Sequence, residues 1–561
     1  MTVTAPRVPG RGGWLPRIGE LLPSARDYAG VRATWRGDLA AGLTVGVVAL
    51  PLALGFGISS GLTAEAGLVT AVVAGALAAL FGGSPVQVSG PTGAMVVVLL
   101  PIVAVHGPAA VALVTLLAGI MVLAGGALRL GRAVSFIPWP VVEGFTLGIA
   151  AIIFLQQVPL MTAPHLPSAG GHSTSALVSA IDAVRTADPV YLAWAIGVGV
   201  IIAGCMLWAP RVHRAVPGSL VGIAVVTVLV SVVPSPLSVI GALPAGFPLP
   251  AIPAVDTATL PSLLLPAVTV AVLAAIESLL SARVAASMAD AGPYDPDREL
   301  VGQGVASVGS ALFGGMPATG AIARTAVNVT SGGRTRVASL THAAVLLVIV
   351  LALSAPVSLI PLPALAAVLI MTAIRMVHAG TVRALVRSTR SDALAFILTA
   401  LITVSVDLIV AVAIGVLLAT VFSLRSLARR AGIQREAVLG PATPGDERIA
   451  IIRFDGPLFF AAADRVFERV SELQEVSVVI LRLSQVELVD ATGARILSDI
   501  VHTLERRGVT VLIKGVQARH ADLFRRIGVL DALRHQNHLF ESLPDAITHA
   551  RSHVRREAAS A

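Results

Sequence analysis

Two short stretches of this chain combine glycine, proline and hydroxyl residues with apolar surroundings. Residues 315–336 read GMPATGAIARTAVNVTSGGRTR and place Arg324 where an apolar segment begins. A charge at membrane depth is costly and is usually retained for function. A helix that begins there also offers unpaired N–H groups and the positive end of its dipole, so we interpret this stretch as half of an anion site. The residues expected to take part are Gly320, Ala321, Ile322 and Arg324.

The other half of the site is predicted at residues 87–95, QVSGPTGAM. Poor helix formers are followed there by an apolar run, and a proline is well tolerated at the start of a helix. The N–H groups near Gly93 and Ala94, with the hydroxyl of Thr92, would hold an oxyanion. Taken alone, the stretch is equally compatible with a packing kink between crowded helices. Its pairing with the first stretch favours the site.

Glu277 lies in an otherwise apolar segment at residues 262–283. An acid in the middle of a membrane indicates a proton relay or a cation ligand. Ser281 lies one helical turn later on the same face. We therefore predict that Glu277 and Ser281 couple transport to a proton or to sodium. The alternative is a structural role, with Glu277 paired to Arg283 or Arg324, and Arg324 could also snorkel to the interface.

The composition shows which elements must position these residues. Of the 561 residues 55% are hydrophobic and 13% are charged, against about 25% charged in soluble domains. We count about fourteen apolar segments, and several are shorter than the ~20 residues that cross a bilayer. Those that begin at the two glycine-rich stretches are predicted to be half-helices lining a cavity.

The chain divides by composition, and its arginines indicate its orientation. We expect an N-terminal segment at 1–37, a transmembrane domain at 38–427, a linker at 428–447, a soluble domain at 448–552 and a tail at 553–561. Arginines concentrate in alternate loops, which predicts that both termini are cytoplasmic. Gly90 and Gly320 are 230 residues apart. That spacing, with an odd number of spans in each half, indicates two inverted repeats whose interrupted helices meet at the midplane.

The soluble tail alternates strands and helices, which predicts an α/β domain with one sheet. Strands are expected at 449–454, 476–483 and 509–515, with helices at 464–473 and 491–507. Thr492 follows Asp490 at the start of the second helix. A phosphate would be favoured at that position, although simple helix capping is the commoner role for such residues.

Several function classes are excluded by what the sequence lacks. We find no Cys/His metal constellation, no phosphate-cradling loop and no nucleophile elbow, so we predict no enzyme and no cofactor other than a possible sodium ion. Cys205 is alone and forms no intrachain disulfide. Lys514 is the only lysine, and the basic residues have no interleaved aromatics, so no nucleic-acid partner is expected.

These stretches together resemble the SulP family, the sulfate permeases and solute carrier family 26. The resemblance rests on residues 38–62 (DLAAGLTVGVVALPLALGFGISSGL), 88–95, 275–282 (AIESLLSA), 320–328 and 332–335, and the tail resembles a STAS domain. The family implies a seven-plus-seven inverted repeat with core and gate domains, elevator-like motion and a dimer. It implies an anion between the third and tenth helices, and in STAS relatives the phosphorylated hydroxyl matches Thr492.

The chain looks most similar to the bacterial bicarbonate branch of that family. Pro51 is followed by Leu52, where many sulfate-type members have glutamine. In the bicarbonate branch the eighth-helix acid binds sodium with a threonine of the tenth helix. The matching position here is Ile322, which has no side-chain oxygen, so a proton is the alternative coupling ion.

We therefore predict a secondary active transporter of bicarbonate or sulfate in a bacterial cytoplasmic membrane, coupled to protons or sodium. Its expected partners are the lipid bilayer, a second copy of the chain and a regulatory protein at the STAS domain. Two alternatives remain at this point. One is a proton symporter of fumarate-like dicarboxylates, and the other is a membrane-tethered STAS regulator whose spans only sense.

Overall fold

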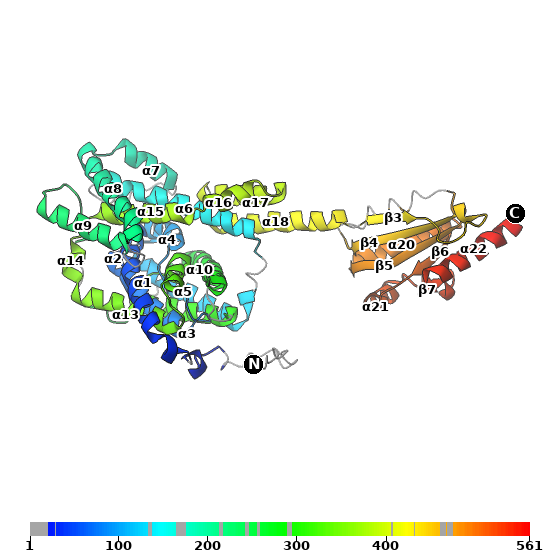
Figure 1. Ribbon diagram of the computed structural model, residues 1–561, viewed down its shortest axis with the longest axis horizontal. Helices are drawn as coiled ribbons and strands as arrows, with labels where there is room; N and C mark the ends of the chain where they lie inside the picture. The colour runs from blue at the N-terminus through cyan, green and yellow to red at the C-terminus, as the bar shows by residue number, and fades with distance from the viewer. Residues whose placement is uncertain are drawn as a thin grey trace. The chain divides into compact units, whose positions relative to one another are not determined.

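The computed structural model describes residues 19–560 with short gaps (Figure 1). The gaps fall at residues 20, 29, 133–136, 164–175, 213–216, 242–245, 255–258, 289–293, 406–407, 431, 461–466, 468–469 and 471–474. The chain forms two compact units, Met1–Val416 and Leu417–Ala561.

The first unit is built from helices. Its elements are η2 (Ala25–Tyr28), α1 (Val31–Ser59), α2 (Ala64–Val69), η3 (Thr70–Ala74), α3 (Gly75–Phe81), β1 (Ser89–Gly90), α4 (Gly93–His106), α5 (Ala109–Ala127), α6 (Trp139–Thr162), α7 (Ala176–Arg185), α8 (Pro189–Val212), α9 (Gly218–Val232), α10 (Leu260–Met288), α11 (Pro296–Leu312), β2 (Thr319–Gly320), α12 (Ile322–Thr330), α13 (Arg336–Ala352), α14 (Ser354–Ser358), α15 (Leu362–Met376), α16 (Ala379–Val386) and α17 (Arg390–Ser405). Helix α18 (Leu408–Arg430) follows and runs into the second unit.

Seven helices among the described residues are long and apolar enough to cross a membrane, and four more apolar helices are shorter. Each of the fourteen predicted apolar segments contains a helix. The short helices α7, α14 and α16 were not predicted, because their apolar stretches are too short to read as spans. The chain is therefore a polytopic helical membrane protein, as its composition predicts.

The order of elements repeats along the first unit. Helices α1 and α10 both have 29 residues and begin 229 residues apart (260 − 31). The two-residue strands β1 and β2 begin 230 apart (319 − 89), and α4 and α12 begin 229 apart (322 − 93). This spacing confirms the predicted duplication, in which each half contributes one short strand followed by a half-length helix.

Glycines allow close contact between helices of the first unit. A Cβ added at Gly67 would lie 1.9 Å from the carbonyl oxygen of Ala53, so α2 lies directly against the backbone of α1. A Cβ at Gly304 would lie 2.5 Å from the backbone nitrogen of Leu123, where α11 packs on α5. Small residues at such interfaces let backbones approach closely, which is how helices pack in a membrane.

The second unit contains a five-stranded sheet. Its elements are β3 (Gly432–Glu436), η5 (Asp446–Arg448), β4 (Ile449–Leu458), β5 (Val478–Val489), α20 (Ala491–Arg506), β6 (Thr510–Lys514), α21 (Ala518–Ile527), η6 (Gln536–His538), β7 (Leu539–Phe540) and α22 (Leu543–Ser560). The strand order is β3-β4-β5-β6-β7, with β3 antiparallel and the others parallel. Helices α20 and α21 cover one apolar face, and α22 covers the other.

Three details of this unit differ from the sequence prediction. Strand β3 lies inside the predicted linker at 428–447, because its pairing with β4 stabilises a sequence that lacks an apolar run. Helix α22 continues to Ser560, through the predicted tail at 553–561. Four strands are parallel, where three were predicted, since β7 has only two residues and no detectable periodicity. Most of the helix predicted at 464–473 lies outside the described residues.

Candidate functional site

The site of the first unit is built where β1 and β2 pair. The two strands are antiparallel, with Ser89 opposite Gly320 and Gly90 opposite Thr319. Helix α4 begins three residues after β1 ends, and α12 begins two residues after β2 ends. The N-cap residues Thr92 and Ala321 make no side-chain capping bond to their helices. The N-termini of α4 and α12 therefore lie close together, and no N-cap side chain satisfies the N–H groups of their first turns.

This pairing depends on two glycines. Gly90 has φ +153°, and a Cβ added there would lie 2.6 Å from an Nη atom of Arg324. A Cβ on Gly320 would lie 1.5 Å from the side-chain nitrogen of Gln87. No side chain fits at either position without displacing its neighbour, so glycine is required where the backbones approach so closely.

A carboxylate from α10 joins the two repeats. Glu277 accepts hydrogen bonds from the hydroxyls of Thr92 and Thr319, each at 2.8 Å, and the two hydroxyl oxygens are 3.0 Å apart. Thr92 is 8% exposed and Thr319 is fully buried. We call Thr92, Glu277 and Thr319 the carboxylate–hydroxyl cluster. Three oxygens this close together form a site where a small cation or a proton can be held.

Arg324 supplies the positive charge of the site. Its side chain is 2% exposed, and its Nη2 donates to the carbonyl oxygen of Pro91 at 2.5 Å. Its Nη1 is buried and has no hydrogen-bond partner among the described residues. The negative charge of Glu277 acts on the guanidinium of Arg324, although the two side chains form no ion pair within the described part of the chain. A buried guanidinium with a free donor beside two helix N-termini is suited to bind an anion.

A second layer of hydrogen bonds fixes the strands around the site. The hydroxyl of Ser278 accepts from the backbone nitrogen of Gly320 at 3.1 Å. The hydroxyl of Thr325 accepts from the backbone nitrogen of Val88 at 3.0 Å. The buried side chain of Gln303 donates to the hydroxyl of Ser89 at 2.6 Å. Because these bonds come from α10, α11 and α12, the site is held by rigid elements on several sides.

The structure brings most of the predicted residues to one place. Gly93 and Ala94 are buried at the start of α4, and Ala321 is 9% exposed. Ile322 is 41% exposed. Ser281 hydrogen-bonds Thr325 at 3.4 Å and makes no recorded bond to Glu277.

Thr319 was missed by the sequence analysis. It supplies the hydroxyl that was looked for at Ile322, three residues earlier in the chain. A signal was present, since Thr-Gly occurs in both stretches, as Thr92-Gly93 and Thr319-Gly320.

In the second unit, Thr492 is exposed at the second position of α20. The capping role falls to Asp490, whose carboxylate accepts from the backbone nitrogen of Gly493 at 2.7 Å. Thr492 is therefore accessible at a helix N-terminus, where a phosphate would be favoured.

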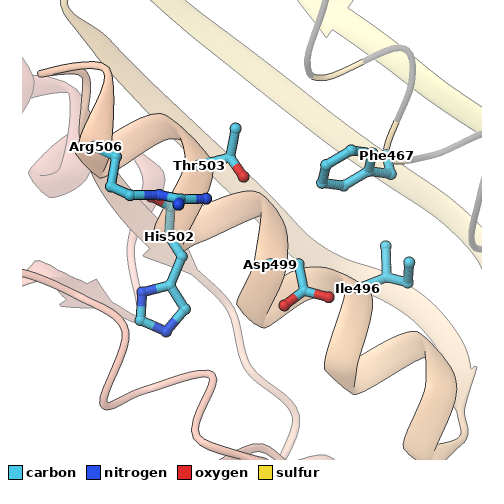
Figure 2. Close-up of a pocket in the computed structure, with 6 residues that line it drawn as sticks. All are labelled: Phe467, Ile496, Asp499, His502, Thr503 and Arg506. Carbon is cyan, nitrogen blue, oxygen red and sulfur yellow. The ribbon is translucent and has the colours of Figure 1, made fainter.

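The same helix α20 also lines a hollow of about 330 Å³ (Figure 2). Its side chains are those of Phe467, Ile496, Asp499, His502, Thr503 and Arg506. Thr492 is not among them, so the hollow and the candidate modification site are separate features of α20.

The fold and the site define a polytopic membrane protein in which two half-helices face a buried charge, with an α/β domain appended. The chain belongs to the sulfate permease family, whose model matches residues 35–399, and a STAS domain matches residues 440–546.

Relatives extend over nearly the whole chain. YvdB of Bacillus subtilis, provisionally named a sulfate transporter, is 33% identical over 90% of this chain and 96% of its own. The bicarbonate transporter BicA of Picosynechococcus sp. is 31% identical over 88% of this chain and 92% of its own. The structure of SLC26A9 matches with a TM-score of 0.82 over 96% of this chain and 94% of that one. At 18% identity it shows the fold alone.

Proposed function

We propose that the protein is a secondary active transporter of small inorganic anions, sulfate or bicarbonate, across a bacterial cytoplasmic membrane. The observation that carries this proposal is the buried guanidinium of Arg324, which has a free donor beside the N-termini of α4 and α12. The names of two relatives, a provisional sulfate transporter and a bicarbonate transporter, indicate the same class of substrate.

The anion would lie between the two helix starts. Its oxygens would accept from the N–H groups of Gly93 and Ala94 at α4 and from those near Ile322 at α12, which their N-cap side chains do not satisfy. Arg324 would contribute its free Nη1 donor and its charge. Helix dipoles and a fixed cation favour a negative ligand most strongly where water is excluded.

Glu277 would carry the coupling ion. An empty site contains one negative charge on the half-buried Glu277 and one positive charge on the buried Arg324. When bicarbonate binds together with a proton or sodium at Glu277, the net charge of the site is unchanged. Moving a site with a net charge through a low-dielectric barrier is costly. Binding of the anion alone would give the site a net charge and oppose the movement, whereas binding of both ions would leave the net charge unchanged and permit it. This is the physical basis we propose for symport by an elevator-like motion.

The hydroxyls of Thr92 and Thr319 leave the choice between proton and sodium open. Both donate to the carboxylate of Glu277, so each could turn a lone pair toward a bound sodium ion. Both hydroxyls donate to Oε2, so a proton on Oε1 of Glu277 would leave both of these bonds in place. We further propose that the protein works as a homodimer with both termini in the cytoplasm, and that its STAS domain binds a regulatory protein.

The test is uptake of labelled bicarbonate and sulfate by the purified full-length protein in proteoliposomes. A proton gradient and a sodium gradient are imposed in separate arms, and bicarbonate is assayed at alkaline pH to limit free CO2. Accumulation driven by protons alone would identify the proton as the coupling ion, and its loss in Glu277→Gln would support Glu277 as the proton carrier. Accumulation that requires sodium would assign the cluster as a sodium site.

A further arm with labelled fumarate examines the dicarboxylate alternative. If neither labelled anion enters and fumarate does, the substrate class is dicarboxylates. If none of the three enters with protein of normal oligomeric state, the transport proposal is wrong, and the regulatory alternative gains support.

A further inference from the structure

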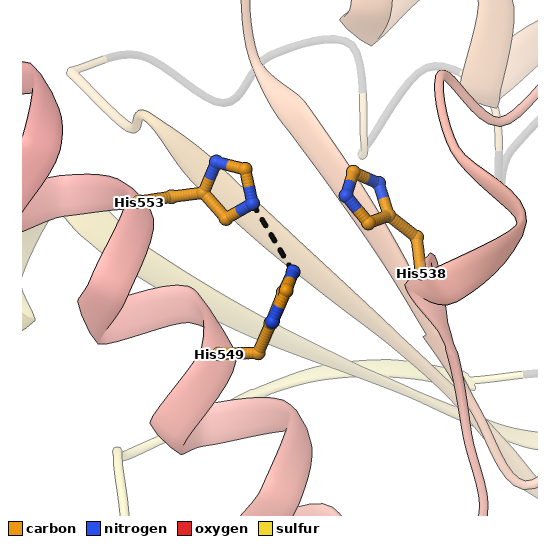
Figure 3. A group of neighbouring side chains, drawn as sticks. All are labelled: His538, His549 and His553. Atoms are coloured by element: carbon orange, nitrogen blue, oxygen red, sulfur yellow. Dashed lines mark hydrogen bonds between the residues drawn. The ribbon is translucent and has the colours of Figure 1, made fainter.

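Three histidines of the second unit lie together. His538 ends η6, and His549 and His553 lie one turn apart on α22 (Figure 3). One ring nitrogen from each lies within 4.8 Å of the other two. No metal site was predicted here from the sequence, because the helical pair and His538, eleven positions earlier, meet only in the folded chain.

The spacing of the helical pair fits a metal ion. The Nε2 atoms of His549 and His553 are 3.2 Å apart. Zinc–nitrogen bonds are about 2.0–2.1 Å long, so two imidazole nitrogens at tetrahedral angles are about 3.3 Å apart. Two histidines at i and i+4 of a helix are also the spacing of the zinc-binding helix of metalloproteases. The pair is therefore positioned for a shared ligand, although a simple hydrogen bond between the rings has the same length.

His538 distinguishes the two explanations. Its side chain is 2% exposed, and its Nδ1 is buried without a hydrogen-bond partner in the described structure. Its ring centroid lies 5.5 Å from that of His549 and 5.4 Å from that of His553. Figure 3 shows the three rings converging on one space. A hydrogen bond within the helical pair gives no reason for a third, buried imidazole there, whereas a metal ion would use it.

The charges around the cluster indicate what kind of ion fits. Its neighbours include Arg534 and Arg556, and the exposed His535 lies with its ring 5.3 Å from that of His538. Three imidazoles without a carboxylate suit the borderline ions zinc, copper and nickel better than magnesium or calcium. The nearby guanidinium groups oppose a cation, so we expect an affinity below that of structural cysteine sites.

We propose that His538, His549 and His553 bind one divalent transition-metal ion, zinc being the expected metal. His538 immediately precedes β7, the edge strand that pairs with β6, and α22 packs over the face of the sheet. The ion would therefore fasten the last helix to the edge of the sheet. Metal binding would stabilise the second unit and would make its stability depend on metal supply.

The experiment uses the full-length protein in detergent, purified through a tag without histidines and stripped with a chelator. Zinc chloride is titrated by calorimetry at pH 7.5, and the melting temperature is recorded with and without the ion. We expect one zinc per chain and a higher melting temperature. The double variant His549→Gln/His553→Gln removes two of the three ligands and should bind more than about 100-fold more weakly, since loss of a hydrogen-bond partner behind a ligand alone costs about 10–100-fold. Equal zinc binding by the double variant and the unchanged protein would overturn the proposal.

His502→Gln is the matched control, since His502 lies in the same unit on α20, outside the cluster. It should bind zinc as the unchanged protein does. The visible absorption of Co²⁺ bound to the unchanged protein provides a second measurement that needs no variant. A tetrahedral nitrogen-ligand spectrum that zinc abolishes would support the site even if the double variant folds poorly. A spectrum of hydrated Co²⁺ would contradict it.

Discussion

The hydroxyl of Thr319 donates to the carboxylate of Glu277 at 2.8 Å, across 42 residues of sequence. Thr92 donates to the same carboxylate oxygen at the same distance. Thr92 belongs to the first repeat and immediately precedes Gly93, the first residue of α4. Thr319 belongs to the second repeat and immediately precedes Gly320, the last residue of β2. Glu277 is therefore held between the two halves of the duplicated fold, and any ion that binds it must interact with both halves.

We expect Thr319→Val to impair coupled uptake. Valine has nearly the same shape, so the substitution removes the donor and leaves the half-buried carboxylate of Glu277 with one partner fewer. A hydrogen bond to a charged group contributes about 1.5–3 kcal/mol, which corresponds to roughly a tenfold to hundredfold loss in driven uptake. Thr319→Ser retains the hydroxyl and should keep most of the activity. Proteoliposome uptake under the driving gradient measures both.

Thr330→Val is the matched control for that substitution. Thr330 is the last residue of α12, at the opposite end of that helix from Thr319; it is exposed, and its hydroxyl bonds only to carbonyl oxygens of its own helix. Uptake by this variant should match that of the unchanged protein. If Thr319→Val also transports normally, then Thr319 has no part in coupling.

We expect Glu277→Gln to uncouple transport. The amide is close in size but can neither take up a proton nor attract a cation, so the anion would exchange without being concentrated. Counterflow of labelled anion against unlabelled anion should persist, while accumulation under a proton or sodium gradient should disappear. Retained accumulation by a correctly assembled variant would remove Glu277 from the coupling step.

The sequence predicted the two half-helices and their starts because those stretches carry strong local signals. Glycine and proline break the apolar pattern near Gly93 and Ile322, and a buried charge marks Arg324. The pairing of β1 with β2 could not be predicted, since two-residue strands have no periodicity. Thr319 was missed for the same reason, because its role depends on the register of that pairing.

The second unit shows the same division between local and tertiary information. Its long buried strands were predicted from apolar runs, whereas β3 has a partly polar sequence and is defined by its partner β4. The cluster of three histidines is a tertiary feature, because His538 joins the i, i+4 pair of His549 and His553 only in the folded chain. Short edge strands, and contacts between residues far apart in the chain, could therefore not be predicted from the sequence.

We expect Arg324→Gln to weaken anion binding. The substitution removes the buried charge and the free Nη1 donor, so the KM for uptake should rise by about tenfold or more, since charge-assisted bonds contribute roughly 1.5–3 kcal/mol. Arg324→Lys keeps the charge but loses the forked geometry, so an intermediate KM is expected.

Arg283→Gln is the control for Arg324, because Arg283 is exposed on α10. Its KM should stay unchanged. A rise in KM for Arg283→Gln equal to that for Arg324→Gln would show a general effect of net charge, not an anion site.

We expect Gly320→Ala to destabilise the first unit. The added Cβ would lie 1.5 Å from the side-chain nitrogen of Gln87, which itself donates to the backbone of Ser278. Overpacking of this kind typically costs about 1–3 kcal/mol, and here it also separates β1 from β2. Gly197→Ala is the control, since nothing lies within 4 Å of a Cβ at that position. Thermal unfolding in detergent should show a lower melting temperature for Gly320→Ala alone.

The N-terminal segment provides a prediction of pH dependence. Asp27 and Arg298 form a two-pronged ion pair, with Nη1 to Oδ1 at 2.9 Å and Nη2 to Oδ2 at 2.7 Å. Their side chains are 17% and 10% exposed. The hydrogen bonds from Arg298 lower the pKa of Asp27 from 3.8 to about 2. Because the pKa is lowered in the folded state, the stabilisation is complete above about pH 5 and is lost as the pH falls toward 2.

We therefore expect Asp27→Asn to lower the free energy of unfolding by about 2 kcal/mol at neutral pH, from a pKa shift of roughly two units. The difference in melting temperature between the two proteins should be the same at pH 7 and pH 5. It should fall to about half at pH 3, where the unchanged protein begins to protonate Asp27 on unfolding. Asp182→Asn serves as the control, since its pair with Arg185 is 3.9 Å long and largely exposed and should contribute little at any pH. A difference for Asp27→Asn that does not change between pH 5 and pH 3 would show that the carboxylate stabilises the fold by packing and not by its charge.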